Sequence, residues 1–176
     1  QLTIDRFGNS LSPARPGRRM RLYAPLYVSN HCINYCLYCG FRYSPNIVRK
    51  HLSVQDTLRQ VRILKEKGFR ELLIVGGEFP KRTTIAYYAK LTQALIENNI
   101  TPAIEIAPQT TRGYADLMAA GVDSVTLYQE CYDEKLYVKY HVRGPKSFYH
   151  WRLESHDRAA EAGVRRLGLG ILLGLA

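Results

Sequence analysis

Short apolar runs alternate with helix-like stretches along most of the chain, and this alternation limits the possible folds more than any other feature. Strands are predicted at residues 22–28, 71–75, 102–106, 124–128 and 166–172. Helices are predicted at about residues 53–67, 84–98, 110–120, 133–140 and 149–162. Because no hairpin turn joins neighbouring strands, we expect parallel strands connected by right-handed crossovers. The expected fold class is α/β: a parallel (β/α) barrel or part-barrel, truncated after about the fifth strand.

Three cysteines, Cys32, Cys36 and Cys39, follow the first predicted strand in a C-x3-C-x2-C spacing. A compact loop can bring three such thiolates to one side, where they can ligate a metal centre. Iron–sulfur clusters usually have four cysteine ligands, so a set of three leaves a coordination position open for chemistry. The alternative is a zinc site with His31 or a distant residue as the fourth ligand.

Size and charge limit the class of protein. The 176 residues give room for one domain with a substantial core. No apolar run approaches the roughly 18 residues of a membrane span, and no signal-peptide pattern is visible, so we expect a cytoplasmic location and no membrane partner. The net charge is +10. Since the basic residues are spread over predicted helix faces, we favour a solvated surface over a nucleic-acid partner.

The two ends of the chain suggest an incomplete sequence. The chain begins with Gln1 rather than methionine, and an apolar run continues into its last residues. We therefore expect a fragment, divided into an irregular basic lead-in at residues 1–21 and a core at residues 22–176 that lacks its C-terminal part.

Notable residues stand at the ends of several predicted strands, which is where parallel barrels place their sites. They are the cysteines, Gly76-Gly77-Glu78, Gln129-Glu130-Cys131 and the glycine-rich stretch 168–174. Glycine lets a backbone approach a ligand closely. A plain tight turn is the alternative explanation for Gly76-Gly77-Glu78.

Six stretches of the chain resemble the radical S-adenosylmethionine (SAM) superfamily, and within it the aromatic amino-acid lyase branch. They are residues 24–32, 38–41, 75–78, 127–134, 151–154 and 168–175. Within that branch the chain is most similar to the tyrosine lyases of thiazole (thiamine) biosynthesis, and nearly as similar to those that mature the hydrogenase cofactor. The resemblance implies a barrel of the radical SAM type.

The resemblance also implies a cofactor site, although no catalytic side chain is assigned. Cys32, Cys36 and Cys39 would ligate a 4Fe–4S cluster, and the amino and carboxylate groups of SAM would bind its fourth iron. The residues expected to bind SAM are Gly76, Gly77 and Glu78 (amino group), Arg152 (carboxylate), Glu105 (ribose), Glu130 (barrel mouth), and Gly170 and Leu172 (adenine). Alternatively, Arg152 is a surface charge beside Glu154, and Glu105 faces outward.

The reaction implied by the resemblance is radical cleavage of tyrosine. SAM would be split to methionine and a 5′-deoxyadenosyl radical, which abstracts hydrogen from the tyrosine amino group. Cleavage of the Cα–Cβ bond would then give 2-iminoacetate (dehydroglycine) and 4-cresol. Expected partners are tyrosine, a reductant such as flavodoxin or ferredoxin and, by analogy alone, a thiazole synthase.

Departures from the family pattern leave other functions open. Cys131 stands where the family usually has threonine, and we expect it to be a small residue of the barrel wall. We expect the sixth β/α unit and the C-terminal substrate-binding region to be missing from this sequence, so the chain is not expected to turn over by itself. The alternatives are a tryptophan lyase, a tyrosine lyase of hydrogenase maturation, an RNA-modifying radical SAM enzyme and a non-catalytic zinc-binding interaction domain.

Overall fold

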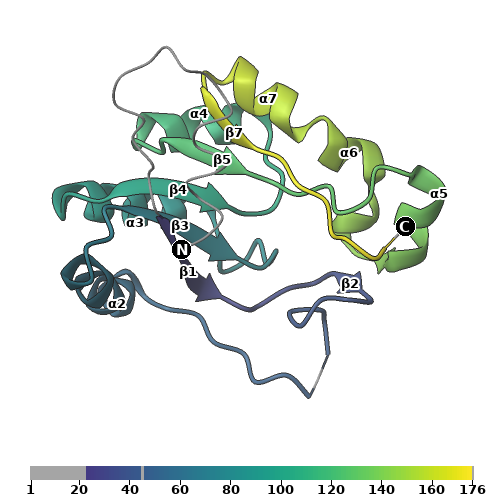
Figure 1. The fold of residues 1–176 in the computed structure, drawn as a ribbon, viewed down its shortest axis with the longest axis horizontal. Coiled ribbons are helices and arrows are strands. Elements are labelled where there is room, and N and C mark those ends of the chain that lie inside the picture. Colours follow the sequence, from purple (N-terminus) through teal and green to yellow (C-terminus); the bar gives the residue numbers. More distant parts are fainter. Residues whose placement is uncertain (1–22, 45, 176) are drawn as a thin grey trace, which may run out of the picture.

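The chain folds around a parallel sheet. The computed structural model describes residues 23–44 and 46–175. Five strands are hydrogen-bonded in chain order (Figure 1): β1 (Tyr23–Ser29), β3 (Glu71–Gly76), β4 (Thr101–Glu105), β5 (Ser124–Thr126) and β7 (Arg166–Gly168). Every neighbouring pair is parallel. Within the described residues the sheet stays open, with β1 and β7 at its edges. The predicted α/β part-barrel is thus confirmed.

Helices connect the strands and cover one face of the sheet. They are α2 (Val54–Glu66), α3 (Ile85–Glu97), α4 (Thr111–Ala119), α5 (Glu134–Tyr140), the 3-10 turn η1 (Pro145–Ser147), α6 (Tyr149–Leu153) and α7 (Ser155–Glu161). Helices α2, α3, α4 and α7 contribute buried side chains to the main core together with the strands. Among the described residues, no helix has the length and apolar character needed to cross a bilayer.

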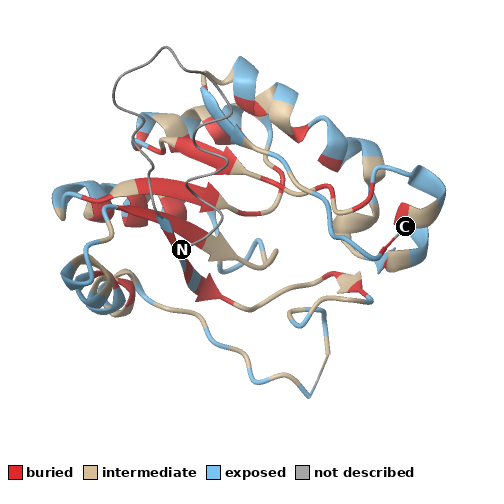
Figure 2. Cartoon of the chain, in the orientation of Figure 1, coloured by how far each residue is buried: buried red, intermediate tan, exposed pale blue. Residues whose placement is uncertain are grey.

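The core lies between the sheet and these helices (Figure 2). In β1 the buried residues Ala24, Leu26 and Val28 alternate with outward ones, so Tyr23 and Tyr27 lie on the opposite face and are 50% and 58% exposed. An alternating strand shows that its second face is not packed against a core. The second face of the sheet at β1 is therefore available to line a cavity.

Capping residues mark the helix boundaries. Ser53 and Asp56 form a reciprocal capping box at the start of α2. At α3 and α4 the hydroxyl groups of Thr84 and Thr110 each accept one backbone N–H of the first turn. Gly68, Gly121 and Gly163 follow the C-terminal ends of α2, α4 and α7 with φ values near +100°. A left-handed residue is the usual way to end a helix, and glycine adopts it without strain.

Three sequence predictions need correction, and one lies outside the described residues. The helix predicted at 149–162 is divided into α6 and α7 by Glu154. The strand predicted at 166–172 ends at Gly168, and most of the following leucines are exposed. A small antiparallel sheet of β2 (Tyr35–Cys36) and β6 (His141–Arg143) was not predicted. The basic lead-in at residues 1–21 falls outside the described part.

Candidate metal centre and cofactor cavity

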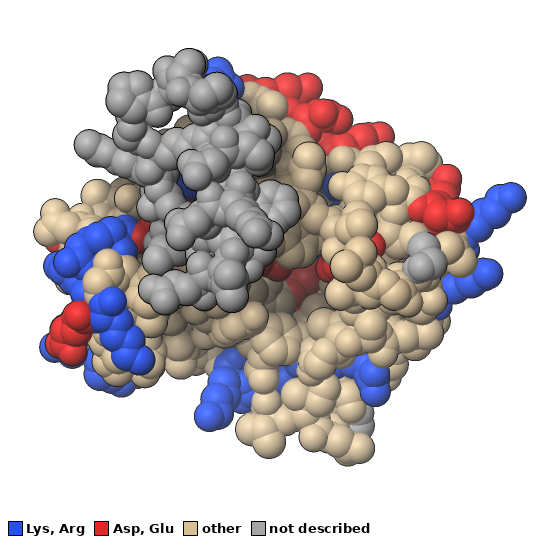
Figure 3. Space-filling view, viewed as in Figure 1, with Lys and Arg blue, Asp and Glu red and all other residues tan. Residues whose placement is uncertain are grey.

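A cavity of about 710 Å³ opens at the C-terminal ends of β1, β3 and β4. It is lined by most of the predicted site residues: Cys32, Cys36, Cys39, Gly76, Gly77, Glu78, Glu105, Glu130 and Arg152. Figure 3 shows a hollow near the middle of one face, with acidic side chains deep inside it. The structure thus brings together, in one cavity, residues from five separate segments of the chain.

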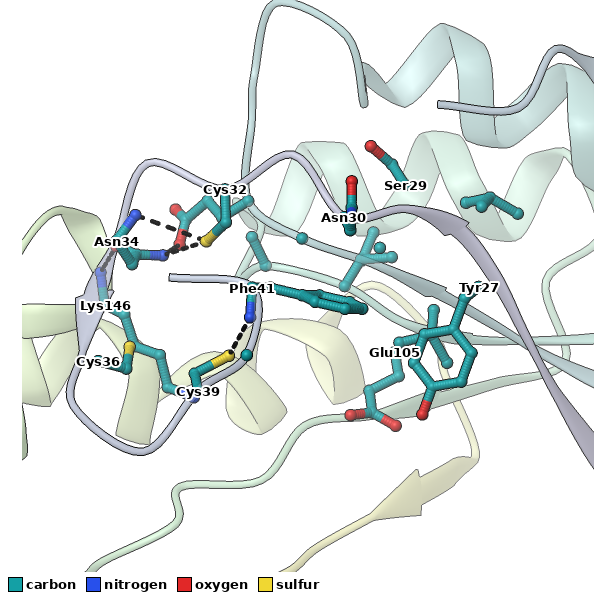
Figure 4. Close-up of a pocket in the computed structure, with 18 of the residues that line it drawn as sticks. Tyr27, Ser29, Asn30, Cys32, Asn34, Cys36, Cys39, Phe41, Glu105 and Lys146 are labelled. Atoms are coloured by element: carbon teal, nitrogen blue, oxygen red, sulfur yellow. Dashed lines mark hydrogen bonds between the residues drawn. The ribbon is translucent and has the colours of Figure 1, made fainter. Parts of the chain in front are cut away.

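The three cysteines lie at one end of this cavity, and Tyr27 and Glu105 lie at the other (Figure 4). All three are free thiols. Cys39 Sγ accepts a hydrogen bond from the Phe41 backbone N–H at 3.3 Å. Burial raises the pKa of the Cys36 thiol to about 11. Cysteine thiolates with backbone N–H donors around them are the donor set that iron–sulfur clusters use.

The arrangement of the cysteines bears on which kind of metal centre they could hold. Nowhere in residues 23–44 and 46–175 do three His, Cys, Asp or Glu side chains converge closely enough to hold one metal ion. In a four-iron cluster each thiolate binds its own iron, so the three sulfur atoms need not meet at one point. The alternative of a zinc site completed by His31 gains no support from this geometry.

Asn34, inside the cysteine motif, connects the motif to two other parts of the site. Its Nδ2 donates to Glu78 Oε2 at 2.7 Å and lies 3.6 Å from Cys32 Sγ. Its Oδ1 accepts the backbone N–H of Lys146 at 2.8 Å. Asn34 is only 2% exposed, so each of these bonds is shielded from water. The side chain therefore holds the first cysteine, the β3 loop and η1 in one arrangement (Figure 4).

Gly76-Gly77-Glu78 forms the β3 loop beside the cysteines. A Cβ at Gly77 would lie 2.4 Å from the His31 carbonyl oxygen, which excludes any larger residue without a backbone shift. The Gly77 N–H donates to the Ser29 carbonyl at 2.9 Å, and the Glu78 carbonyl accepts the N–H of Ile33 at 2.9 Å. Burial raises the pKa of the Glu78 carboxyl, and the bond from Asn34 opposes that rise. The glycines thus let the cysteine loop and the β3 loop meet.

Glu130 occupies a strained position at the cavity wall. Its φ of 70° lies in the left-handed region, which is uncommon for a residue with a side chain. Its carboxylate pairs with Lys146 Nζ at 3.0 Å, and both side chains are mostly buried. Its carbonyl accepts the Leu172 N–H at 2.9 Å. Strained residues that the surroundings hold firmly are concentrated at functional sites.

Arg152, on α6, is buried rather than a surface charge. It is 8% exposed, and its Nε and Nη2 both donate to the Tyr128 carbonyl, at 2.9 and 2.8 Å. The ion pair of Glu154 is instead with Arg158, at 3.7 Å. Because Arg152 lines the cavity, it can present positive charge to an anionic group there.

Glu105 lies on the cavity side of β4 rather than facing outward. It lines the cavity, and burial, followed by the charge of Glu130, raises the pKa of its carboxyl. Gly170 and Leu172 are not among the lining residues. They follow β7 on the wall that carries Glu130, so their contact with an adenine stays a prediction. Cys131 is buried against Tyr137 and Leu175, away from the cavity.

A buried pair supports the cysteine loop from behind. His141 Nδ1 lies 2.8 Å from the Tyr137 carbonyl oxygen, which can only accept, so Nδ1 carries the proton. Nε2 then accepts from the Tyr38 hydroxyl at 2.5 Å. Burial lowers the pKa of His141 to about 4. Tyr38, which stands between Cys36 and Cys39, is thereby fixed to the second sheet.

Sequence reasoning missed several residues of the site: Asn34, Arg49, His141 and Lys146. Arg49 donates to the carbonyls of Asn30, Phe41 and Arg42 and so joins both ends of the cysteine loop. Asn34 could have been noticed because it stands within the motif. His141 and Lys146 carry no local signal, since their partners lie more than 100 residues away or on another element.

Comparison with known proteins agrees with this geometry. The family model described as Radical SAM superfamily matches residues 26–175. The 2-iminoacetate synthase of Escherichia coli (strain K12) is 40% identical over 176 residues, which is 100% of this chain and 44% of that protein. The 3-methylornithine synthase of Methanosarcina acetivorans is 31% identical over 134 residues, covering 72% of this chain and 37% of that protein.

A solved structure supports the same fold. The FeFe-hydrogenase maturase HydG from Carboxydothermus hydrogenoformans matches with a TM-score of 0.83 and 36% identity, over 90% of this chain and 38% of that chain. The chain therefore spans less than half the length of these relatives.

Proposed function

The chain belongs to the radical SAM superfamily, and we propose that Cys32, Cys36 and Cys39 hold a 4Fe–4S cluster next to SAM in the adjoining cavity. The observation that carries the proposal is the shared cavity: the three cysteines open into the same space as Gly76-Gly77-Glu78 and Arg152. When bound, the reduced cluster would supply the electron that splits SAM into methionine and a 5′-deoxyadenosyl radical.

The side chains of the cavity would orient SAM. The backbone of Gly76 and Gly77 and the Glu78 carboxylate would receive the SAM amino group, and Arg152 would attract its carboxylate. Glu105, whose carboxyl is buried in the cavity, would bond the ribose hydroxyls, and Glu130 would lie near SAM at the cavity mouth. Gly170 to Leu172 would lie along the adenine. The protein's part is to bind, orient and exclude water.

The proposed reaction is cleavage of the tyrosine Cα–Cβ bond to 2-iminoacetate and 4-cresol, in thiamine thiazole biosynthesis. The 40% identity to a 2-iminoacetate synthase along the whole chain supports this choice. The similarity to HydG favours, as a second candidate, a tyrosine lyase of hydrogenase maturation. A reductant such as flavodoxin or ferredoxin, a thiazole synthase partner and a cytoplasmic location belong to the same proposal.

One experiment tests SAM cleavage and the tyrosine lyase reaction separately. The chain spans 44% of the 2-iminoacetate synthase relative, so the test uses the chain joined to the part of that relative that it does not span. This protein is reconstituted and incubated anaerobically with dithionite and SAM, with tyrosine or tryptophan added, and the products are identified by mass spectrometry. Formation of 5′-deoxyadenosine tests SAM cleavage, and tyrosine-dependent 4-cresol tests the lyase reaction. Products of tryptophan cleavage would point to a different lyase, while absence of 5′-deoxyadenosine would contradict the proposal at its base.

A further inference from the structure

Asn34 places one amide between two groups that carry negative charge in the proposed site. Its Nδ2 lies 2.7 Å from Glu78 Oε2 and 3.6 Å from Cys32 Sγ, and its backbone nitrogen lies 3.5 Å from the same sulfur. An amide –NH2 group has two hydrogens, so it can donate to both neighbours at once. A carboxylate and a thiolate beside the same amide repel each other, and donors placed between them offset that repulsion.

The surrounding bonds determine which way the amide points. Its Oδ1 accepts the Lys146 backbone N–H at 2.8 Å (Figure 4). Exchanging the oxygen and the nitrogen would set Nδ2 against that N–H and Oδ1 against the Glu78 carboxylate, so the network allows one orientation. A Cβ on Gly144 would overlap Oδ1, so the chain just before η1 packs directly on the amide. Because Asn34 is buried, water does not compete for these bonds.

The bond to Glu78 bears on how the amino group of SAM would be received. Burial raises the pKa of the Glu78 carboxyl, and the Asn34 bond opposes that rise, so the bond favours the charged form. It also holds one carboxylate oxygen in place. A charged and oriented carboxylate is a strong acceptor for an ammonium group. Asn34 therefore prepares Glu78 for the role proposed above.

The contact with Cys32 bears on the cluster. The reduction potential of an iron–sulfur cluster depends on its charge and on hydrogen bonds to its sulfur atoms. An N–H directed at a ligating sulfur stabilises the negative charge that reduction adds. Both nitrogens of Asn34 lie beside Cys32 Sγ, so they are placed to make the cluster easier to reduce.

We propose that Asn34 is a positioning residue that couples Glu78, and with it the SAM amino group, to Cys32 at the cluster. The inference rests on the proposed function, because it assumes that Glu78 receives that amino group and that Cys32 binds iron. Asn34 acts through these two neighbours: Nδ2 holds the Glu78 carboxylate in place and also donates toward the sulfur. Loss of the side chain should therefore affect SAM binding through Glu78 and cluster reduction through Cys32.

A double-mutant cycle on Asn34 and Glu78 tests this coupling. Asn34→Ala, Glu78→Ala and the double variant are made in the joined protein of the lyase test, which contains the whole of this chain. After anaerobic reconstitution, equilibrium dialysis gives the dissociation constant of SAM for the cluster-loaded protein. A redox titration without SAM gives the midpoint potential of the cluster.

Asn34→Ala should weaken SAM binding about tenfold or more in the parent protein, and less than about threefold when Glu78 is already alanine. The second effect is small because the carboxylate that Asn34 positions is gone. Asn34→Ala should make the midpoint potential more negative in both backgrounds, since the contact with Cys32 does not depend on Glu78. A general loosening of the loop would not produce this pattern.

Two further variants separate this role from a loss of stability. Asn34→Leu fills the space of the amide without a donor and should give the same pattern, so it replaces Asn34→Ala in the cycle if that variant does not fold. Ser155→Ala removes a buried bond to the Tyr114 hydroxyl, outside the cavity. This control should keep its SAM dissociation constant within about threefold of the parent value and its midpoint potential unchanged.

Two results would overturn the inference. An equal loss of SAM affinity with and without Glu78 would mean that Asn34 only holds the loops together. An unchanged midpoint potential in Asn34→Ala would mean that Cys32 takes no part in the coupling. A parent protein that forms no cluster, or whose cluster binds no SAM, would instead contradict the proposed function itself.

Discussion

At the scale of single residues, Asn34 shows how one buried amide can connect three parts of a site. Its side chain bonds the Glu78 carboxylate and the Lys146 backbone and lies against Cys32 Sγ. When a buried polar group loses its hydrogen-bond partner, its unfavourable desolvation free energy is no longer offset by a bond. Truncation of Asn34 would leave the buried Glu78 carboxyl in this unfavourable state.

We therefore predict that Asn34→Ala lowers the free energy of unfolding by about 2 to 4 kcal/mol. The matched control is Asn46→Ala, because Asn46 is exposed, and a change within about 0.5 kcal/mol is expected there. Urea unfolding followed by circular dichroism measures both. Equal stability of the two variants would show that the Asn34 contacts contribute little.

His141 supplies a second prediction, on pH. Its folded-state pKa, near 4, is below its unfolded value of 6.5, so the unfolded chain binds more protons in this window. The stability that neutral His141 provides is present above about pH 6.5 and is lost as the pH falls toward 4. The free energy of unfolding of the parent, relative to His141→Phe, should fall by roughly 3 kcal/mol across this window.

The difference between parent and variant matters because other groups titrate nearby. His156 has a lowered pKa, while Glu78 and Glu105 have raised ones and act in the opposite direction. Subtracting the His141→Phe curve removes these contributions. Parallel stability curves for the two proteins would mean that His141 is not the group responsible.

At the scale of elements, the site depends on the close approach of two loops. The loop after β1 and the loop after β3 meet where a Cβ on Gly77 would lie 2.4 Å from the His31 carbonyl. Gly40, in the same cysteine loop, has nothing within 4 Å of the corresponding position. The two glycines therefore differ in the space around them.

Gly77→Ala should force the two loops apart, lower the free energy of unfolding by about 2 to 4 kcal/mol and weaken SAM binding. Gly40→Ala should change stability by less than about 1 kcal/mol. Thermal unfolding and equilibrium dialysis with SAM measure the two effects. If Gly77→Ala bound SAM as the parent does, the close approach would not be needed for the site.

Elements with strong local signals could be predicted from the sequence, and those made by distant contacts could not. Ser53, Thr84 and Thr110 mark their helices because a cap acts within one turn. The β2–β6 sheet joins Cys36 to His141 and leaves no turn signal between its strands. The apolar run after Gly168 has a strand-like composition, yet Gly170 packs closely against the ring of Tyr128 and the regular strand ends at Gly168. Only an isolated bridge between Ile171 and Glu130 continues the pairing.

At the scale of the whole molecule, the parallel topology gathers the chemistry at one edge of the sheet. Cys32 follows β1, Glu78 follows β3 and Glu130 follows β5, so a right-handed parallel sheet brings them together. This gathering could be predicted from strand order alone. Two further contacts support the site: Lys146 pairs with Glu130, and His141 bonds the Tyr38 hydroxyl. Both contacts depend on how α5, β6 and η1 pack against the cysteine loop, which strand order does not determine.

We propose that three cysteines of this cavity hold a cluster that SAM contacts. The most direct test of this cluster site is anaerobic reconstitution with iron and sulfide, followed by electron paramagnetic resonance of the reduced chain with and without SAM. The matched variants are Cys36→Ala, from the cavity, and Cys131→Ala, which is buried away from it.

We predict a reduced 4Fe–4S signal that changes when SAM is added, is lost in Cys36→Ala and is kept in Cys131→Ala. A cluster signal that ignores SAM, or zinc bound in place of iron, would contradict the account.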